Sequence, residues 1–285
     1  MKAYNDCISC FLIQALKVSR ITSKDEKVHR QILNKVMERL IHVSLEVSPP
    51  EIAQTVYSTI KEITKNPDPY KEAKQRQNKL AMAIYPEIKA MIAESKDPLF
   101  LSVRLAIAGN IIDLGINKEI KDIKREVISC FKKPLSINHY AKFKEKLNNS
   151  EILLYLGDNA GEIVFDKILI EEIKKVKEIK VYFVVRGAPI INDATVEDAN
   201  FVMMEEVAKV VSNGFDAPAT ILSKSLPIIP KLFSQADMII SKGQGNYEAL
   251  SDEEKNIFFL LKVKCPIVSR DLGVVEGSGI LKSQI

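Results

Sequence analysis

The sequence of 285 residues contains no tryptophan, only four cysteines and three histidines, and no long uninterrupted run of apolar residues. Four cysteines are too few for a disulfide scaffold in a chain of this length. No segment approaches the ~18 consecutive apolar residues of a membrane-spanning helix, and the N-terminus lacks the apolar core of a signal peptide. We therefore expect a cytoplasmic protein without a membrane partner.

An excess of one sign of charge is also absent. The chain has 41 Lys and Arg residues against 37 Asp and Glu residues, for a net charge of +4, and the two signs are mixed along it. Such a surface lacks the basic stripe of a nucleic-acid-binding protein, so we expect no nucleic-acid partner. The histidines, His29, His42 and His139, do not have the spacing of a zinc site. Composition leaves the oligomeric state open.

The first half of the chain has a helical pattern. In residues 1–148 apolar residues recur at spacings of three and four. The break at Asn66-Pro67-Asp68-Pro69 precedes a long helix, expected from about Tyr70 towards Met91 with Pro86 interrupting or kinking it. No convincing strand appears before about residue 150. We predict an all-helical domain over residues 1–148.

The second half has a different pattern. Short apolar runs rich in β-branched residues suit parallel strands buried on both faces. Between the first two runs lies a helix with its charged residues on the face opposite the apolar one, which makes a strand–helix–strand unit. The strong strand predictions are Ile152–Leu156, Val181–Val185 and Met238–Ile240, and the weaker ones are Val207–Val211, Phe258–Val263 and Ile267–Ser269. We predict an α/β domain over residues 149–285.

Polar residues follow the three strong strand predictions. An Asp158-Asn159 pair follows the first, Asp193 follows the second, and Lys242 and Asn246 follow the third. In open parallel sheets ligands bind outside the carboxyl ends of the strands. We therefore expect these side chains to share one edge of the sheet.

These residue types suit a site for phosphate groups. Two carboxylates and an amide oxygen, from Asp158, Asp193 and Asn159, are ligands for a hard divalent cation such as Mg²⁺ or Mn²⁺. The helix that begins near Gly161 would direct free backbone N–H groups at an anion, and Lys242 would add a positive charge. Each part alone is common in turns, helix caps and solvated surfaces. Their shared place at the strand ends favours phosphoryl chemistry.

Two features of the helical half stand apart. The pair in Cys7-Ile8-Ser9-Cys10 lies on an expected helix, where it suits either buried core cysteines or a soft-metal or redox role. In a second apolar helix Gly109 and Asn110 are followed by Asp113. Helix packing explains the glycine but not the asparagine, because a buried amide needs hydrogen-bond partners.

Taken together, the motifs resemble the metal-dependent damage-control phosphatase family, once catalogued as a domain of unknown function, and within it the subfamily that carries an N-terminal CxxC. In chain order they are Cys7-x-x-Cys10, Ala108-Gly109-Asn110-x-x-Asp113, Gly157-Asp158-Asn159-Ala160-Gly161-Glu162, Asn192-Asp193-Ala194-Thr195 and Lys242-Gly243-Gln244-Gly245-Asn246-Tyr247-Glu248. The resemblance implies an α/β fold in which a helical N-terminal domain packs on a three-layer α/β/α domain with a mainly parallel sheet, and a metal site between the two.

The resemblance also implies roles for single residues. Asp158, Asn159 and Asp193 would hold the divalent metal, which in the family is often Mn²⁺, Ni²⁺ or Co²⁺ rather than Mg²⁺. Lys242 and Asn110 would contact the substrate. The implied activity is a phosphatase of metabolite damage control that hydrolyses phosphate monoesters of small metabolites. Sugar phosphates, nucleotides, and damaged purine nucleotides or their precursors are the implied substrates.

Other residues and other readings stay open. Glu162 and Glu248 are candidates for a base or a supporting residue, and Asn246 and Glu162 for substrate contact. Asp158 and Asp193 leave both mechanisms open, attack by water and attack by an aspartate.

Three alternatives compete with the phosphatase of this family. A haloacid-dehalogenase-type phosphatase also uses strand-end aspartates and a lysine, but it needs an Asp-x-Asp that Asp158-Asn159-Ala160 does not supply. A methyltransferase needs spaced glycines that the Gly157–Gly161 turn lacks. A non-catalytic sensor of a phosphorylated metabolite would use nearly the same residues as the enzyme.

Overall fold

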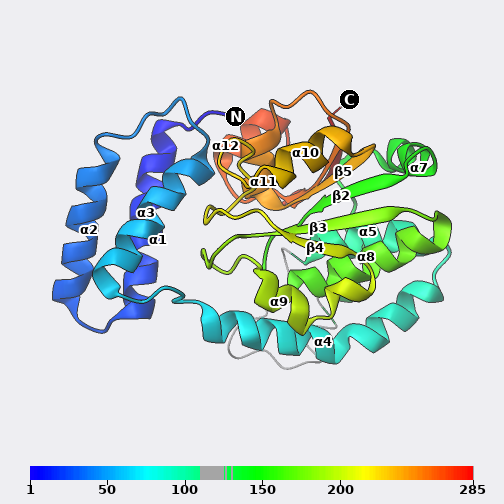
Figure 1. The fold of residues 1–285 in the computed structure, drawn as a ribbon, viewed down its shortest axis with the longest axis horizontal. Coiled ribbons are helices and arrows are strands. Elements are labelled where there is room, and N and C mark those ends of the chain that lie inside the picture. Colours follow the sequence, from blue (N-terminus) through cyan, green and yellow to red (C-terminus); the bar gives the residue numbers. More distant parts are fainter. Residues whose placement is uncertain (110–124, 126, 130, 285) are drawn as a thin grey trace.

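A computed structural model describes residues 1–109, 125, 127–129 and 131–284 (Figure 1). The helices are α1 (Asn5–Thr22), α2 (Glu26–Leu40), α3 (Pro49–Thr64), α4 (Lys71–Ala93), α5 (Pro98–Ala108), α7 (Tyr140–Asn148), α8 (Glu162–Val176), α9 (Val196–Phe201), α10 (Ile228–Gln235), α11 (Gly243–Leu250) and α12 (Pro266–Leu272), with a 3₁₀ turn at Met204–Glu206. The strands are β1 (Ile137–Asn138), β2 (Ile152–Leu156), β3 (Lys180–Val185), β4 (Lys209–Ser212), β5 (Met238–Lys242), β6 (Ile257–Lys262) and β7 (Gly279–Ser283). Among the described helices, none is long and apolar enough to cross a membrane.

The strands form one sheet in the order β1-β7-β6-β5-β2-β3-β4. Neighbouring strands are parallel except for β6 and β7, which pair antiparallel. Strand β2 lies between β3 and β5, and the register sets Leu156 beside Val184 on one side and Ser241 on the other. The turns that follow these three strands therefore lie next to one another, as the sequence predicts.

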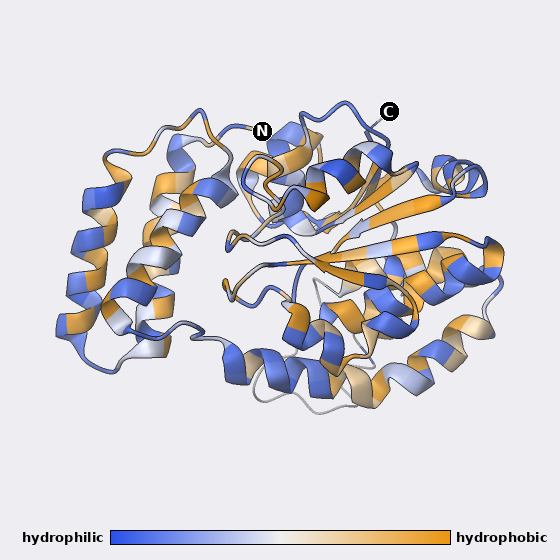
Figure 2. Ribbon diagram, viewed as in Figure 1, coloured by the Kyte–Doolittle hydropathy of each residue, from blue (hydrophilic) through white to orange (hydrophobic). Residues whose placement is uncertain are grey.

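Two helical layers cover the sheet because successive strand residues point to opposite faces. Leu153 and Tyr155 pack with α4, α5 and α8, whereas Leu154 and Leu156 pack with α10, α11 and α12. In Figure 1 these two sets of helices lie on either side of the strands, and Figure 2 shows the strands mainly in the hydrophobic colour. The α/β fold with its three layers and mainly parallel sheet is confirmed.

Helices α1, α2 and α3 form a bundle to one side of the sheet (Figure 1). The bundle has its own core, which Ile190 joins from the loop after β3. Ser48 and Glu51 form a capping box at the start of α3, and Pro49 occupies the first helical position. The division between residues 148 and 149 stays a prediction. Helices α4 and α5 precede it in the chain yet pack on the sheet.

Some local predictions are confirmed and others are wrong. The long helix is present as α4, which continues through Pro86 without an interruption. The strand expected at Ile267–Ser269 is wrong, because these residues belong to α12, which Cys265 caps and Pro266 begins. Strands β1 and β7 pair with each other and were not expected. The two-residue β1 corrects the view that no strand precedes residue 150.

Several charged residues of α8 are buried inside the protein. Glu162, Asp166, Lys167 and Glu172 are all buried, and both α4 and α5 pack against this helix. The fold therefore places several charges of this helix inside the protein.

Ile190→Ala should lower the free energy of unfolding by about 2–5 kcal/mol, the usual cost of this truncation in a core. Ile190 is 1% exposed and belongs to the bundle core although it follows β3. Urea denaturation measures the change. The control is Val196→Ala at a side chain that is 40% exposed, where we expect at most about 0.5 kcal/mol. Equal losses in the two variants would contradict the shared core.

Candidate active site

A cleft of about 910 Å³ lies between the bundle and the carboxyl ends of the strands. It is large enough for a small-molecule ligand. The side chains that line it include Cys7, Cys10, Phe11 and Tyr57 from the bundle, and Asp158, Asn159, Glu162, Asp193, Gln244, Glu248, Lys264 and Cys265 from the other wall. Three predicted metal ligands thus face one cleft.

The turns after β2 and β3 are joined through their backbones. Asn159 and Asp193 form an antiparallel bridge. The N–H of Ala194 donates to the carbonyl oxygen of Asp158 over 2.8 Å, and the N–H of Ala160 donates to that of Asn192 over 2.9 Å. These bonds hold the Asp158-Asn159 pair and Asp193 together, although 33 or more residues separate them in the chain.

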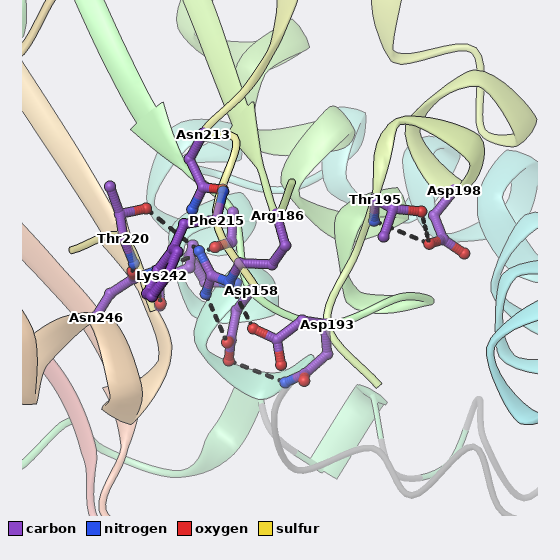
Figure 3. Close-up of polar contacts among 12 residues, drawn as sticks. Asp158, Arg186, Asp193, Thr195, Asp198, Asn213, Phe215, Thr220, Lys242 and Asn246 are labelled. Atoms are coloured by element: carbon purple, nitrogen blue, oxygen red, sulfur yellow. Dashed lines mark hydrogen bonds and ion pairs between the residues drawn. The ribbon is translucent and has the colours of Figure 1, made fainter. Parts of the chain in front are cut away.

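Arg186 lies between the two aspartates (Figure 3). Its Nε donates to Asp193 Oδ2 over 2.6 Å, its Nη2 lies 3.6 Å from Asp158 Oδ1, and its Nη1 donates to Thr220 Oγ1 over 3.3 Å. The side chain is 1% exposed. Sequence reasoning assigned Arg186 no role. The available signal was a charged residue directly after a buried strand.

The amide of Asn159 lies between two carboxylates. Its Nδ2 donates to Asp158 Oδ2 over 2.9 Å and to Glu162 Oε1 over 2.7 Å. Both bonds use the nitrogen, so the carbonyl oxygen is the group that this amide can offer to a ligand.

The anion site expected at the start of α8 is only partly present. The N–H of Ala160 is bonded to Asn192, and the N–H of Gly161 donates to Asn78 Oδ1 over 2.6 Å. Protein groups therefore occupy two of the donors that the sequence assigned to a ligand.

The structure explains why a glycine, Gly243, follows Lys242. Its φ is +81°, and a Cβ at this position would lie 2.0 Å from Asp158 Oδ2. Only glycine combines this left-handed backbone with so close an approach. The first turn of α11 is thereby brought against the Asp158 carboxylate.

Lys242 is fully buried rather than solvated. Its Nζ bonds Asp166 Oδ1 over 2.7 Å and lies 3.7 Å from Glu162 Oε2. It contributes no surface to the cleft, so it stands behind the lining residues. Asp166 also accepts from the Tyr155 hydroxyl over 2.7 Å. The sequence did not single out Asp166, although a charge one turn after Glu162 in an apolar helix was a signal.

Asn246 is placed as a structural residue. Its Oδ1 accepts from the N–H of Thr220 over 2.7 Å, and its Nδ2 donates to the carbonyl oxygens of Gly157 and Lys242 over 3.0 and 2.8 Å. The amide thus ties the ends of β2 and β5 to the segment at Thr220. The structure does not bring Asn246 into the lining of the cleft.

Burial of several acids in one place perturbs their ionisation. Burial and the charge of Asp158 raise the pKa of Glu162 to about 8, against the opposing effect of Lys242. Burial and the same aspartate raise the pKa of Asp193 to about 7, against Arg186. The pKa of Lys242 is lowered by burial, but its carboxylate neighbours outweigh this and raise it overall. Such shifts are typical of functional sites.

The donor chemistry fits a divalent cation. Four buried carboxylates, those of Asp158, Glu162, Asp166 and Asp193, face two buried cations, Arg186 and Lys242. Formally two negative charges remain, which a divalent cation would balance. Within the described part of the chain, no group of three His, Cys, Asp or Glu side chains is arranged to hold a metal. A metal here would therefore need the amide oxygen of Asn159 beside the carboxylates, with water or phosphate oxygens as well.

The helical half contributes its cysteines to the cleft. Cys10 is exposed, and Cys7 and Cys265 are half-buried, so the reading of the pair as buried core cysteines is wrong. Burial raises the pKa of the Cys7 thiol, which does not favour a reactive thiolate. Asn110, which was predicted to contact the substrate, and Asp113 of the same motif lie outside the described residues. Gly109, directly before Asn110, lines the cleft.

The sheet is mostly parallel, and a charged cleft lies at the carboxyl ends of its strands. This is the place where open α/β proteins bind their ligands. The chain matches the family model of the damage-control phosphatase ARMT1-like domain over residues 3–280. It is 36% identical over 292 residues to a damage-control phosphatase of Archaeoglobus fulgidus, with 99% of each chain covered. It is 34% identical over 283 residues to damage-control phosphatase PH1575 of Pyrococcus horikoshii, with 98% of this chain and 96% of that one covered.

The fold agrees with these similarities. The crystal structure of the DUF89 family protein PH1575 from Pyrococcus horikoshii superimposes with a TM-score of 0.95 at 32% identity, over 100% of both chains. The chain belongs to the damage-control phosphatase family, which the order of its motifs predicted. Membership supports a phosphatase with a role in metabolite repair.

Lys242→Met should lower the free energy of unfolding by about 3–5 kcal/mol, because it leaves a buried carboxylate without its cation. Asp166→Asn in the Lys242→Met background should recover part of this loss, since it removes the uncompensated charge and keeps an acceptor for Tyr155. Urea denaturation measures both variants. A loss below about 0.5 kcal/mol in Lys242→Met is what a solvated lysine would give, and it would contradict the buried pair.

Glu248→Gln should stabilise the protein at alkaline but not at acid pH. Burial, with a contribution from Asp158, raises the pKa of Glu248 to about 7. The unfolded side chain ionises near its ordinary value of about 4.3. Between these values the folded state keeps a proton that the unfolded state has lost, so stability falls as pH rises. A glutamine at this position does not ionise, so it causes no such fall in stability, and its side-chain oxygen can still accept from Gln244.

Urea denaturation without added metal tests this linkage at about pH 4 and about pH 8. The difference in unfolding free energy between Glu248→Gln and the wild type should be larger at the higher pH. The same difference at both pH values would show that Glu248 titrates as an exposed carboxyl group does.

Proposed function

We propose that the protein is a metal-dependent phosphatase that hydrolyses phosphate monoesters of small metabolites. The observation that carries the proposal is the backbone bridge between the Asp158-Asn159 turn and the Asp193 turn, at the strand ends that line the cleft. Asp158, Asn159 and Asp193 would hold a divalent cation, with Mn²⁺, Ni²⁺, Co²⁺ and Mg²⁺ as the candidates. When bound, the cation would supply positive charge to the phosphoryl oxygens.

Four other residues have separate roles in the proposed reaction. Arg186 keeps the two aspartates together against their mutual repulsion. Lys264, exposed at the cleft, acts electrostatically on both Glu162 and Asp193, so it can attract an anionic substrate. Glu162 lines the cleft, and its raised pKa lets it hold and release a proton near neutral pH. Lys242 acts from behind Glu162 and Asp166 as a positioning residue.

The cleft also bears on the substrate class. The wall opposite the acids carries Phe11, Tyr57 and Tyr70, together with Pro49 and Pro50. A phosphate group would meet the charged edge, and an organic part of moderate size would meet this apolar wall. We therefore propose sugar phosphates and nucleotides, including damaged purine nucleotides and their precursors, as the substrates to test first.

Asp158→Asn and Asp193→Asn should each lower kcat by ~10²–10³-fold, as expected when a group that stabilises developing charge is lost. Both variants keep the shape of the side chain. The assay follows phosphate release from a panel of sugar phosphates and nucleotides with each of the four metals, and calorimetry follows Mn²⁺ binding. Mn²⁺ affinity should fall together with kcat.

The matched control is Asp252→Asn, which alters a largely exposed aspartate that pairs with the N-terminus. It should keep wild-type turnover and Mn²⁺ affinity. Binding of a phosphorylated compound by the wild type without phosphate release under any metal would refute the enzymatic proposal. Full activity of Asp158→Asn would refute the assignment of that ligand.

A further inference from the structure

Asn78 lies on α4, outside every motif that the sequence singled out. Its side chain is 1% exposed. Helix α4 packs against both α8 and α9, the helices that follow the Asp158 turn and the Asp193 turn. A buried amide at this junction needs partners, and the two turns supply them.

The first contact is with the Asp158 turn. Asn78 Oδ1 accepts from the N–H of Gly161 over 2.6 Å. Gly161 has a φ of +77° and precedes the first residue of α8. At the start of a helix the backbone N–H groups have no helical carbonyl to bond. Asn78 therefore fixes the end of the turn that begins with Asp158 and Asn159.

The second contact is with the Asp193 turn. Asn78 Nδ2 donates to Asp198 Oδ1 over 2.8 Å. Asp198 Oδ2 accepts from the N–H and the hydroxyl of Thr195, both over 2.9 Å (Figure 3). Thr195 caps α9 and stands two residues after Asp193. The amide of Asn78 thus reaches the second turn through one carboxylate.

We infer that Asn78 is a positioning residue of the phosphatase site, which sets the Asp158 turn and the Asp193 turn relative to each other. The inference rests on the proposed function, since it assigns Asn78 to the same site. Only a side chain that accepts at one atom and donates at another can join a backbone N–H to a carboxylate, and asparagine does both. Asn78 is absent from the lining of the cleft, so it acts through the turns and not on the substrate.

The carboxylate in this bridge has its own support. Lys74, one turn before Asn78 on α4, lies 3.4 Å from Asp198 Oδ2 and 3.0 Å from Asp68 Oδ2. The lysine is thus an ion-pair partner of the carboxylate that accepts from Asn78, and hydrogen bonds in which one partner is charged are the stronger ones. Helix α4 therefore holds both turns with neighbouring residues on one of its faces.

The first test is Asn78→Ala. Loss of a residue that orients metal ligands typically costs 10–100-fold in affinity or activity, so we expect Mn²⁺ affinity and kcat to fall by about that factor. KM should stay unchanged, because Asn78 does not reach the cleft. Hydrogen–deuterium exchange should become faster in peptides that cover residues 157–165 and 192–199. Ile88→Val, a buried change on the same helix in the core with the sheet, serves as the stability control.

The second test exchanges the two partners. Asn78→Asp alone sets two carboxylates against each other, and Asp198→Asn alone removes the charged acceptor. In the double variant, Asp198→Asn supplies a donor to the new carboxylate at position 78, and that carboxylate still accepts from the N–H of Gly161. The double variant should recover Mn²⁺ affinity and kcat relative to both single variants. It also carries the test if Asn78→Ala does not fold.

Two outcomes would overturn the inference. One is an Asn78→Ala variant that loses only thermal stability, as Ile88→Val does, with exchange in the two turns and Mn²⁺ affinity unchanged. The other is a double variant that is no better than its single parents. A wild-type protein without phosphatase activity is a different failure. It would refute the proposed function, whereas the exchange data would still report whether Asn78 joins the turns.

Discussion

The ion pairs of Arg186 are the interaction on which the rest of the site depends. Two aspartates that converge in neighbouring turns repel each other, and both are buried. The guanidinium group is a rigid fork that can meet two acceptors at once, and it lies between Asp158 and Asp193. Its other end is held through Thr220, whose backbone is bonded to Asn246. The ends of β2, β3 and β5 are thereby connected through side chains as well as through the sheet.

Burying so many charges costs folding free energy, and the apolar packing of the rest of the domain offsets that cost. Buried ion pairs contribute little net stability, because desolvation opposes their attraction. The stabilising contribution comes from the apolar layers on both faces of the sheet, where Leu153, Leu154, Tyr155 and Leu156 of β2 are all fully buried. The charged turn follows directly after this apolar strand. The residues that stabilise the fold and the acids of the site are therefore separated along the chain. The apolar strand comes first, and the acids follow in the turn.

The sequence predicts those parts of the site that are local. A buried strand, a turn and a helix follow one another within a few residues, so Asp158 and Asn159 could be placed at a strand end, and so could Lys242. The burial of Lys242 and Asp166 could not be predicted, because the helices that cover α8 come from a distant part of the chain. The short segment Ile267–Ser269, with only two apolar residues, fits a strand or a helix equally well. Cys265 caps the helix and Pro266 begins it. A proline just before the apolar residues is a helix-start signal that was present in the sequence.

The bundle lines the cleft and also constrains the position of one of the acids on the opposite wall. Ile190 packs in the bundle core, and the next residue, Ile191, has a φ of +45°. A β-branched residue in this region is strained, at a cost of about 1–3 kcal/mol. The strain persists because the bundle holds the loop at two points, through Ile190 in its core and through Lys61 of α3, which donates to the carbonyl oxygen of Pro189 over 2.6 Å. Asp193 stands two residues further on, so the helical half determines where this aspartate lies.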